Sequence, residues 1–174
     1  MNQSLVITAI GEDRPGIVNE LSRTLLDAGL NIEDSRMSVL GGEFAVMLLV
    51  SGSSTAINTI EKAAEHLSES LNLKLLIKAT SQPEKTETHS ACTIRVEGMD
   101  NPGIVHKLTE YLSRNHINII NMQTSSSHAP HTGTPLFSVQ VRVNIPPAQD
   151  INSFQAEFTE LCDALNMDTE FTSD

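Results

Sequence analysis

Apolar residues recur along this chain at two spacings, one typical of β-strands and one typical of helices, and the two kinds of segment alternate several times. Short runs of alternating or continuous apolar residues, such as 5–10 and 92–97, are typical of β-strands. Apolar residues three or four positions apart predict amphipathic helices between those strands. The helix-forming sets are Ile17, Leu21 and Leu25; Ile57, Ile60, Ala64, Leu67 and Leu71; Ile104, Leu108 and Leu112; and Ile151, Phe154, Phe158, Leu161 and Leu165. Each half of the chain is therefore predicted to run strand, helix, strand, strand, helix, strand.

The second half of the chain repeats the first. When residues 11–32 are placed over residues 98–119, ten of 22 positions are identical. The later helices match at an offset of 94 instead of 87, so seven extra residues lie between, and we place them in the segment 128–135. We therefore predict a duplicated domain. The first domain spans residues 1–80, a polar linker spans 81–90 and the second domain spans 91–174.

Each repeat predicts a two-layer fold. Both helices of a repeat carry a single apolar face, so both can cover one side of a four-stranded antiparallel sheet. Gly41 and Gly42 have the composition of a two-residue hairpin turn between the second and third strands. The predicted fold class is α+β, with two ferredoxin-like βαββαβ domains whose helices lie on one face of each sheet.

The two repeats differ in the strand that follows the hairpin. Apolar and polar residues alternate over 136–143 in the second repeat, whereas residues 44–50 of the first are apolar throughout. Ile10 likewise stands where the second repeat has Glu97. A sheet with one solvated face alternates, and a sheet covered on both faces does not. We expect the outer face of the first sheet to be covered by the second domain, by a second chain in a homodimer, or by a partner protein.

Composition excludes several classes of protein. The 174 residues include 11 Lys and Arg against 22 Asp and Glu, a formal net charge of −11. An acidic chain without a basic block is poorly suited to bind phosphate backbones, so we expect no direct contact with nucleic acid. No apolar run reaches the roughly 18 residues of a membrane span, and the beginning of the chain lacks the pattern of a signal peptide. With two cysteines and no disulfide framework, we expect a cytoplasmic protein without membrane contact.

The segment between the first strand and the first helix is the candidate site of each repeat. It reads Asp13-Arg14-Pro15-Gly16 in the first and Asp100-Asn101-Pro102-Gly103 in the second. We place the proline at the first helical position, where the free N–H groups and the helix dipole attract a carboxylate. Glycine lets a ligand approach the backbone, and the aspartate can take the ammonium group of an amino acid. The alternative is that the aspartate only caps the helix.

The predicted ligand-binding set extends to both sides of the first helix. It comprises Asp13, Arg14, Pro15, Gly16, Ile17 and Asn31 in the first repeat, and Asp100, Asn101, Pro102, Gly103, Ile104 and Asn118 in the second. The two asparagines follow that helix, where their tolerance of left-handed backbone also favours a purely structural role at the helix end. Because Arg14 is charged and Asn101 is not, the two loops need not bind the same ligand.

No catalytic or metal-binding constellation is evident, and we predict no catalytic residue, metal or cofactor. His128 and His131 invite a metal interpretation, but Pro130 argues against the helix that would bring them together. The longer hairpin loop that contains them is instead a candidate for partner contacts. Cys92 and Cys162 fall on or near predicted core faces, which favours buried structural thiols.

The motif Asp-x-Pro-Gly-Ile-Val, between the first strand and first helix of a βαββαβ unit, resembles the ACT domain, a regulatory module that binds amino acids. The stretches 5–18, 31–36 and 43–52, together with the tandem layout, resemble the family of glycine cleavage system transcriptional repressors. This resemblance covers nearly the whole chain and is strongest in the first repeat. It implies a non-enzymatic regulator that represses the glycine cleavage operon by contacting a LysR-type activator, with glycine as the natural signal.

Two other functions are compatible with these residues. A ligand-free adaptor would use only the apolar face of the first sheet. A small enzyme on the ferredoxin-like fold is the third option, because fold does not fix function. An acylphosphatase, however, is expected to have an arginine in a glycine-rich phosphate loop behind the first strand, and residues 98–103 contain none. A ligand titration separates the sensor from the adaptor.

Overall fold

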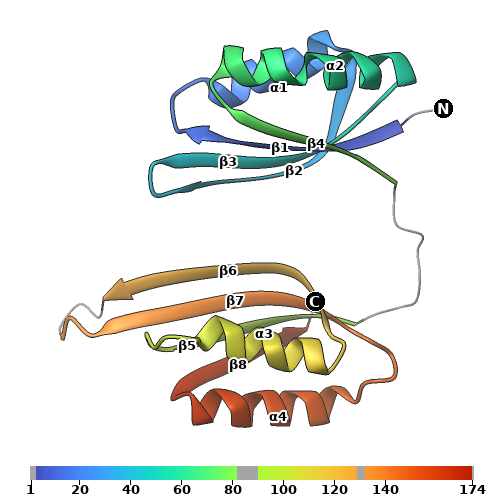
Figure 1. The fold of residues 1–174 in the computed structure, drawn as a ribbon. Coiled ribbons are helices and arrows are strands. Elements are labelled where there is room, and N and C mark those ends of the chain that lie inside the picture. Colours follow the sequence, from blue (N-terminus) through green and yellow to red (C-terminus); the bar gives the residue numbers. More distant parts are fainter. Residues whose placement is uncertain (1–2, 82–89, 129–131, 174) are drawn as a thin grey trace. The chain divides into compact units, whose positions relative to one another are not determined.

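The computed structural model divides into two compact units, Met1–Glu84 and Lys85–Asp174. It describes residues 3–81, 90–128 and 132–173. Most of the predicted linker, residues 82–89, therefore lies outside the described residues, and Ser90 already belongs to the first strand of the second unit. Figure 1 shows the helices and strands of each unit.

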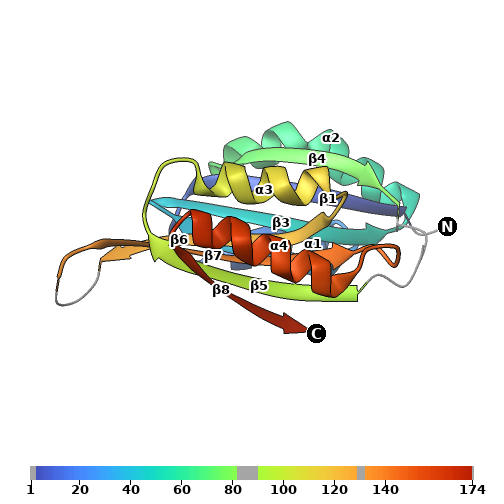
Figure 2. The same ribbon diagram turned by 90° about the horizontal axis from the view of Figure 1, so that it is seen from below.

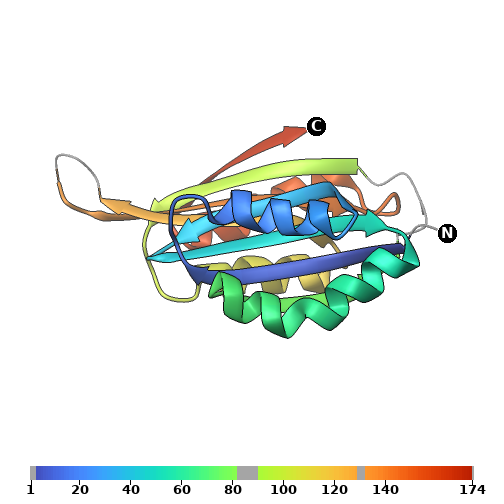
Figure 3. The same ribbon diagram turned by 90° about the horizontal axis from the view of Figure 1, so that it is seen from above.

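The first unit is a four-stranded antiparallel sheet with two helices on one face (Figure 3). Its elements are β1 (Gln3–Glu12), α1 (Ile17–Asp27), β2 (Leu30–Leu40), β3 (Glu43–Gly52), α2 (Ser54–Leu71) and β4 (Lys74–Thr80). The strand order is β2-β3-β1-β4, so the first strand of the chain is central and β2 and β4 are the edges.

The second unit repeats this topology (Figure 2). Its elements are β5 (Ser90–Met99), α3 (Ile104–Arg114), β6 (Asn118–His128), β7 (Pro135–Ile145), α4 (Ile151–Ala164) and β8 (Met167–Ser173), in the strand order β6-β7-β5-β8. The predicted fold class, two ferredoxin-like βαββαβ repeats of class α+β, is confirmed.

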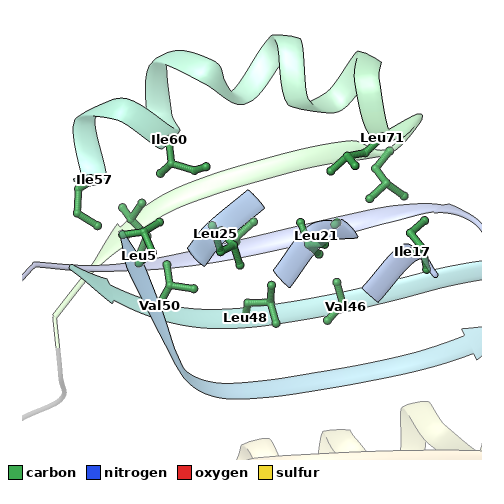
Figure 4. Packing of buried hydrophobic residues seen from close by; sticks show 14 of the residues in the cluster. Leu5, Ile17, Leu21, Leu25, Val46, Leu48, Val50, Ile57, Ile60 and Leu71 are labelled. Atoms are coloured by element: carbon green, nitrogen blue, oxygen red, sulfur yellow. The ribbon is translucent and has the colours of Figure 1, made fainter. Parts of the chain in front are cut away.

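A separate hydrophobic core holds each unit together. In the first, Ile17, Leu21 and Leu25 of α1 are buried against the sheet, beside Leu5 and Val50 (Figure 4). The equivalent residues Ile104, Leu108 and Leu112 of α3 are buried in the second core. The helical phase predicted from apolar spacing is therefore correct for both helices. Ile151, also predicted to lie on an apolar helix face, is exposed because α4 begins at that residue.

The second core differs from the first in its aromatic content. Tyr111 of α3 and Phe154 and Phe158 of α4 have ring centroids 5.7 to 6.2 Å apart, and Phe171 of β8 packs edge-on against both phenylalanines. Edge-to-face and offset ring pairs add about 0.5–1.5 kcal/mol each beyond the burial of their area. The first core contains one aromatic side chain, Phe44.

The hairpin between the second and third strands is longer in the second unit. Gly41 and Gly42 join β2 to β3 as predicted, and Gly41 has the positive φ of 66° that such a turn requires. The pairs Gly11–Phe44 and Gly98–Phe137 are equivalent, so the offset between the units grows from 87 to 93 across the hairpin. Six of the seven extra residues therefore lie in the hairpin, and the seventh lies after β7.

The outer faces of the two sheets, on the side away from the helices, differ in polarity. That of the first sheet has an apolar centre composed of Val6, Ile10, Ala45, Met47, Leu49 and Leu76. Met47 is 52% exposed and Leu76 is 67% exposed. The outer face of the second sheet is polar, with Thr93, Arg95, Glu97, Ser138, Gln140, Arg142, Asp168 and Glu170. The predicted contrast between the sheets is present, and the coverage of the first remains a prediction.

Candidate functional site

The loop from the first strand to the first helix has the same backbone in both units. Gly16 precedes α1 with φ 88°, and Gly103 precedes α3 with the same angle. This left-handed conformation favours glycine, and it is the reason that a glycine stands at this position. Pro15 and Pro102 lie before the N-cap, so their predicted placement at the first helical position is wrong.

Neither aspartate caps its helix. No side-chain hydrogen bond caps α1 or α3, whereas Ser53 caps α2 and Asp150 caps α4. The capping alternative for Asp13 and Asp100 is therefore wrong. Their backbone N–H groups bind the neighbouring hairpin instead: Asp13 donates to the Gly42 carbonyl at 3.1 Å and Asp100 to the Pro135 carbonyl at 3.2 Å. Both carboxylates are exposed.

Backbone N–H groups remain unpaired at the starts of α1 and α3. In the first unit the Ile17 N–H reaches the Arg14 carbonyl at 3.4 Å, and no described residue accepts from the N–H groups of Val18 and Asn19. In the second, no described residue accepts from the N–H groups of Val105 and His106. Unpaired N–H groups at a helix start, together with the helix dipole, make a place where a carboxylate or another anion is stabilised.

An ion pair occupies the helix start of the first unit. The Arg14 guanidinium donates two hydrogen bonds to the Glu20 carboxylate, at 2.8 and 2.6 Å. This hydrogen bonding raises the pKa of Arg14 and lowers the pKa of Glu20. A Cβ added to Gly16 would lie 3.8 Å from a Glu20 carboxylate oxygen. The first loop therefore already has a carboxylate beside its helix start, and that carboxylate neutralises Arg14.

The second loop lacks this ion pair. Asn101 replaces Arg14, and its amide donates to the Met99 carbonyl at 3.3 Å. Lys107 replaces Glu20, and it forms no ion pair with any residue in the described part of the chain. Apart from the glycine and its immediate chain neighbours, no described residue has an atom within 4 Å of a Cβ built on Gly103. This helix start is therefore open, and Asp100 and Lys107 flank it in the sequence.

The structure does not bring the predicted asparagines to these loops. Asn31 pairs with Ser51 and Ser4 pairs with the same residue, so Asn31 lies near the beginning of β1 and Asp13 follows its end. Nine residues of strand separate these points, roughly 30 Å at about 3.3 Å per residue. Asn118 and Asp100 are separated in the same way in the second unit.

The asparagines also do not end the first helix of either unit. The left-handed residues at those helix ends are Gly29 and His116. Asn31 donates from its amide to the Glu33 carboxylate at 2.9 Å, within the edge strand β2. The structural role predicted for the asparagines at the helix end is therefore wrong.

An open pocket of about 780 Å³ lies at the Asn31 end of the first unit. Glu33, Ser51, Asn58 and Glu61 are among its lining residues. Ser51 and Asn31 donate hydrogen bonds to Glu33 and lower the pKa of its carboxyl group. No sequence motif predicts this pocket, because its lining residues come from several separate strands and from α2.

Two glycines of the site region were not singled out from the sequence. A Cβ on Gly11 would lie 2.7 Å from Leu73 Cδ2 and 2.9 Å from the Asn72 carbonyl oxygen. A Cβ on Gly98 would lie 2.7 Å from the Asn166 carbonyl oxygen. Each glycine thus lets the turn before the last strand pack against the strand that leads into the loop. Their identity in the two repeats was the available signal.

The two cysteines and the paired histidines of the sequence are the remaining groups considered as candidate chemistry. Cys92 and Cys162 are buried as predicted, and burial raises the pKa of the Cys162 thiol. Among residues 3–81, 90–128 and 132–173, no three His, Cys, Asp or Glu side chains are grouped to hold a metal ion. His128 ends β6, and His131 lies outside those residues. None of the described helices is long and apolar enough to cross a membrane.

Comparison with known proteins agrees with the tandem fold. The model of the ACT domain family matches residues 3–78. The chain is 33% identical over 162 residues to the glycine cleavage system transcriptional repressor of Escherichia coli K12, covering 93% of this chain and 85% of that protein. It is also 36% identical over 77 residues to a protein of Streptococcus mutans, covering 44% of this chain and 88% of that protein.

Two solved structures share the arrangement over the full length. One is provisionally named a glycine cleavage system transcriptional repressor, with 31% identity, a TM-score of 0.74, and coverage of 100% of this chain and 98% of that one. The other is a protein of unknown function from Galdieria sulphuraria, with 27% identity, a TM-score of 0.78, and coverage of 100% and 99%. Both repeats of the chain therefore have counterparts in proteins of known structure.

Proposed function

Because this chain belongs to the family of glycine cleavage system transcriptional repressors, we propose that it senses a small amino acid, with glycine favoured, and represses the glycine cleavage operon. It does so as a non-enzymatic regulatory protein in the cytoplasm, by contacting an activator of the LysR type. The observation that carries the sensing half is the open helix start of the second unit, where unpaired N–H groups lie between Asp100 and Lys107.

Recognition of an amino acid requires one site for each of its charged ends. The N–H groups at the start of α3 and the Lys107 ammonium favour the carboxylate, and the Asp100 carboxylate favours the ammonium group. The first loop is the weaker candidate, because the Glu20 carboxylate beside its helix start repels a second carboxylate. We therefore propose that the second unit binds the ligand more tightly than the first.

The charge of the chain supports the proposal that it contacts an activator protein and not DNA. A net charge of −11 repels a phosphate backbone. Ligand binding changes the contact only as far as the amino acid has different affinities for the activator-bound and free states. A mobility-shift assay in which the protein alone retards the operator DNA would contradict this proposal, and retardation that requires the activator supports it.

Calorimetric titration of the full chain with glycine, and then with serine and alanine, tests the sensing proposal. We expect Asp100→Ala and Lys107→Glu to weaken binding about tenfold or more, since each removes a charge-assisted contact. Asp13→Ala is the matched variant of the first loop and should have a smaller effect. Lys62→Glu makes the same charge change on α2 of the first unit and should have none. No heat at millimolar amino acid would favour the ligand-free adaptor.

A further inference from the structure

We infer that the outer face of the first sheet binds the same face of a second molecule of this chain. The apolar centre of that face consists of side chains that neither helix of the unit covers, with Met47 and Leu76 more than half exposed. Buried apolar area drives association, and large exposed apolar patches mark interaction sites. The equivalent face of the second sheet is polar, so a second molecule's first sheet is the better apolar match.

The register of the strands sets the side chains of this face in rows that cross the sheet. One row runs Lys78, Val6, Leu49, Asp34 from β4 to β2. The next runs Leu76, Thr8, Met47, Arg36. The first row therefore has a cation at one end, an anion at the other, and apolar side chains between them.

This row is complementary to itself under a two-fold axis. An axis parallel to the strands, between β1 and β3, places β4 of one molecule over β2 of the other and keeps each row over its own copy. Lys78 then faces Asp34 of the second molecule at both ends, and Val6 faces Leu49. Packed sheets cross at about 30°, but row ends lie only about 7 Å from the axis, so a lysine side chain still reaches across.

Asp34 is available for such a contact. Its carboxylate is exposed and accepts from Arg36 and from the Ser35 N–H, interactions that lower its pKa and keep it ionised. Glu33, next to it, lies on the same face, since its carboxylate accepts from Ser51. Asp34 therefore ends this row, and Glu33 adds a second carboxylate beside it on the same face for the lysine of the second molecule.

Sedimentation velocity of the full chain across micromolar concentrations tests the inference. We expect a concentration-dependent dimer, and Met47→Asp should weaken it at least about tenfold, because the two-fold axis brings both introduced charges into the apolar centre. Met47 is exposed in the single chain, so the variant should fold, and circular dichroism checks this. Gln140→Asp, at the equivalent position of the second sheet, should leave dimerisation unchanged.

Charge reversal tests the direction of packing. Lys78→Glu and Asp34→Lys should each weaken the dimer, and the double variant should recover most of the loss, because both contacts are then reversed together. A wild-type chain that stays monomeric to about 100 μM, a dimer that survives Met47→Asp, or one that Gln140→Asp weakens equally, overturns the inference. A double variant that is weaker than either single one overturns the two-fold arrangement. Glycine binding is measured separately and does not enter these outcomes.

Discussion

The hydroxyl of Tyr111 is partly buried and hydrogen-bonded, and both features change its pKa. Its hydroxyl lies 3.0 Å from a Glu157 carboxylate oxygen, and its ring packs against Phe154 and Phe158. Burial, the hydrogen bond to Glu157 and the charge of Glu157 raise the pKa of Tyr111 to about 12. Because the folded pKa is higher than the unfolded one, this interaction stabilises the fold below pH about 10, and the stabilisation is lost as pH rises toward 12.

Replacing the acceptor tests that contact. Glu157→Gln should lower the pKa of Tyr111 toward, but not to, 10, because burial remains after the charge is removed. The chain has one tyrosine and no tryptophan, so phenolate absorbance follows this side chain alone. Glu160→Gln, on the same helix, is the matched control and should leave the titration unchanged. An unshifted Glu157→Gln titration would contradict the hydrogen bond.

At the scale of the element, the sequence pattern predicted which face of a helix is buried better than it predicted where the helix begins. The spacing of Ile17, Leu21 and Leu25 predicted the buried face of α1 because apolar burial has the helical period. The predicted beginning of α1 was wrong. Proline is common at the first helical position, so Pro15 was expected there, but the backbone shows that Gly16 is the N-cap and that the helix begins at Ile17.

The candidate site was predictable in its parts but not in its distances. The repeated Asp-x-Pro-Gly motif correctly predicted two equivalent helix starts with unpaired N–H groups. The predicted ligand-binding set also included Asn31, because it follows the helix in the sequence. In the structure, the length of β1 separates Asn31 from Asp13. The Arg14–Glu20 pair was also missed, since their spacing follows no helical pattern when one partner lies in a loop.

The packing of the strand before each loop yields a further prediction. Gly98→Ala should destabilise the second unit by roughly 1–3 kcal/mol, because its Cβ would meet the Asn166 carbonyl and the Met167 backbone. Gly42→Ala is the matched control: nothing lies within 4 Å of its Cβ and no positive φ is required there. Chemical denaturation measures both. Equal stabilities of the two variants would show that the turn moves aside at no cost.

At the scale of the whole molecule, the two hydrophobic clusters share no residue. We therefore expect a core mutation to act on one unit. Phe158→Ala should cost the second unit about 3–5 kcal/mol, and Leu5→Ala should cost the first about 2–5 kcal/mol. Amide hydrogen exchange resolves the units: strand amides of β1 and β3 should keep their protection in Phe158→Ala. Loss of protection in both units from either mutation would show a single cooperative fold.

The difference between the two outer sheet faces also bears on how a duplicated chain folds. Neighbouring repeats with one topology can exchange strands during folding, a known failure of repeat proteins. If β5 took the place of β1, Arg95 would stand beside Met47 and Glu97 beside Ala45, so two charged side chains would lie in the apolar centre of this face. The wrong pairing is therefore less favourable than the native one. Because the outer faces of the two sheets differ in polarity, each strand pairs more favourably within its own sheet. This difference favours assembly of each half of the chain from its own strands.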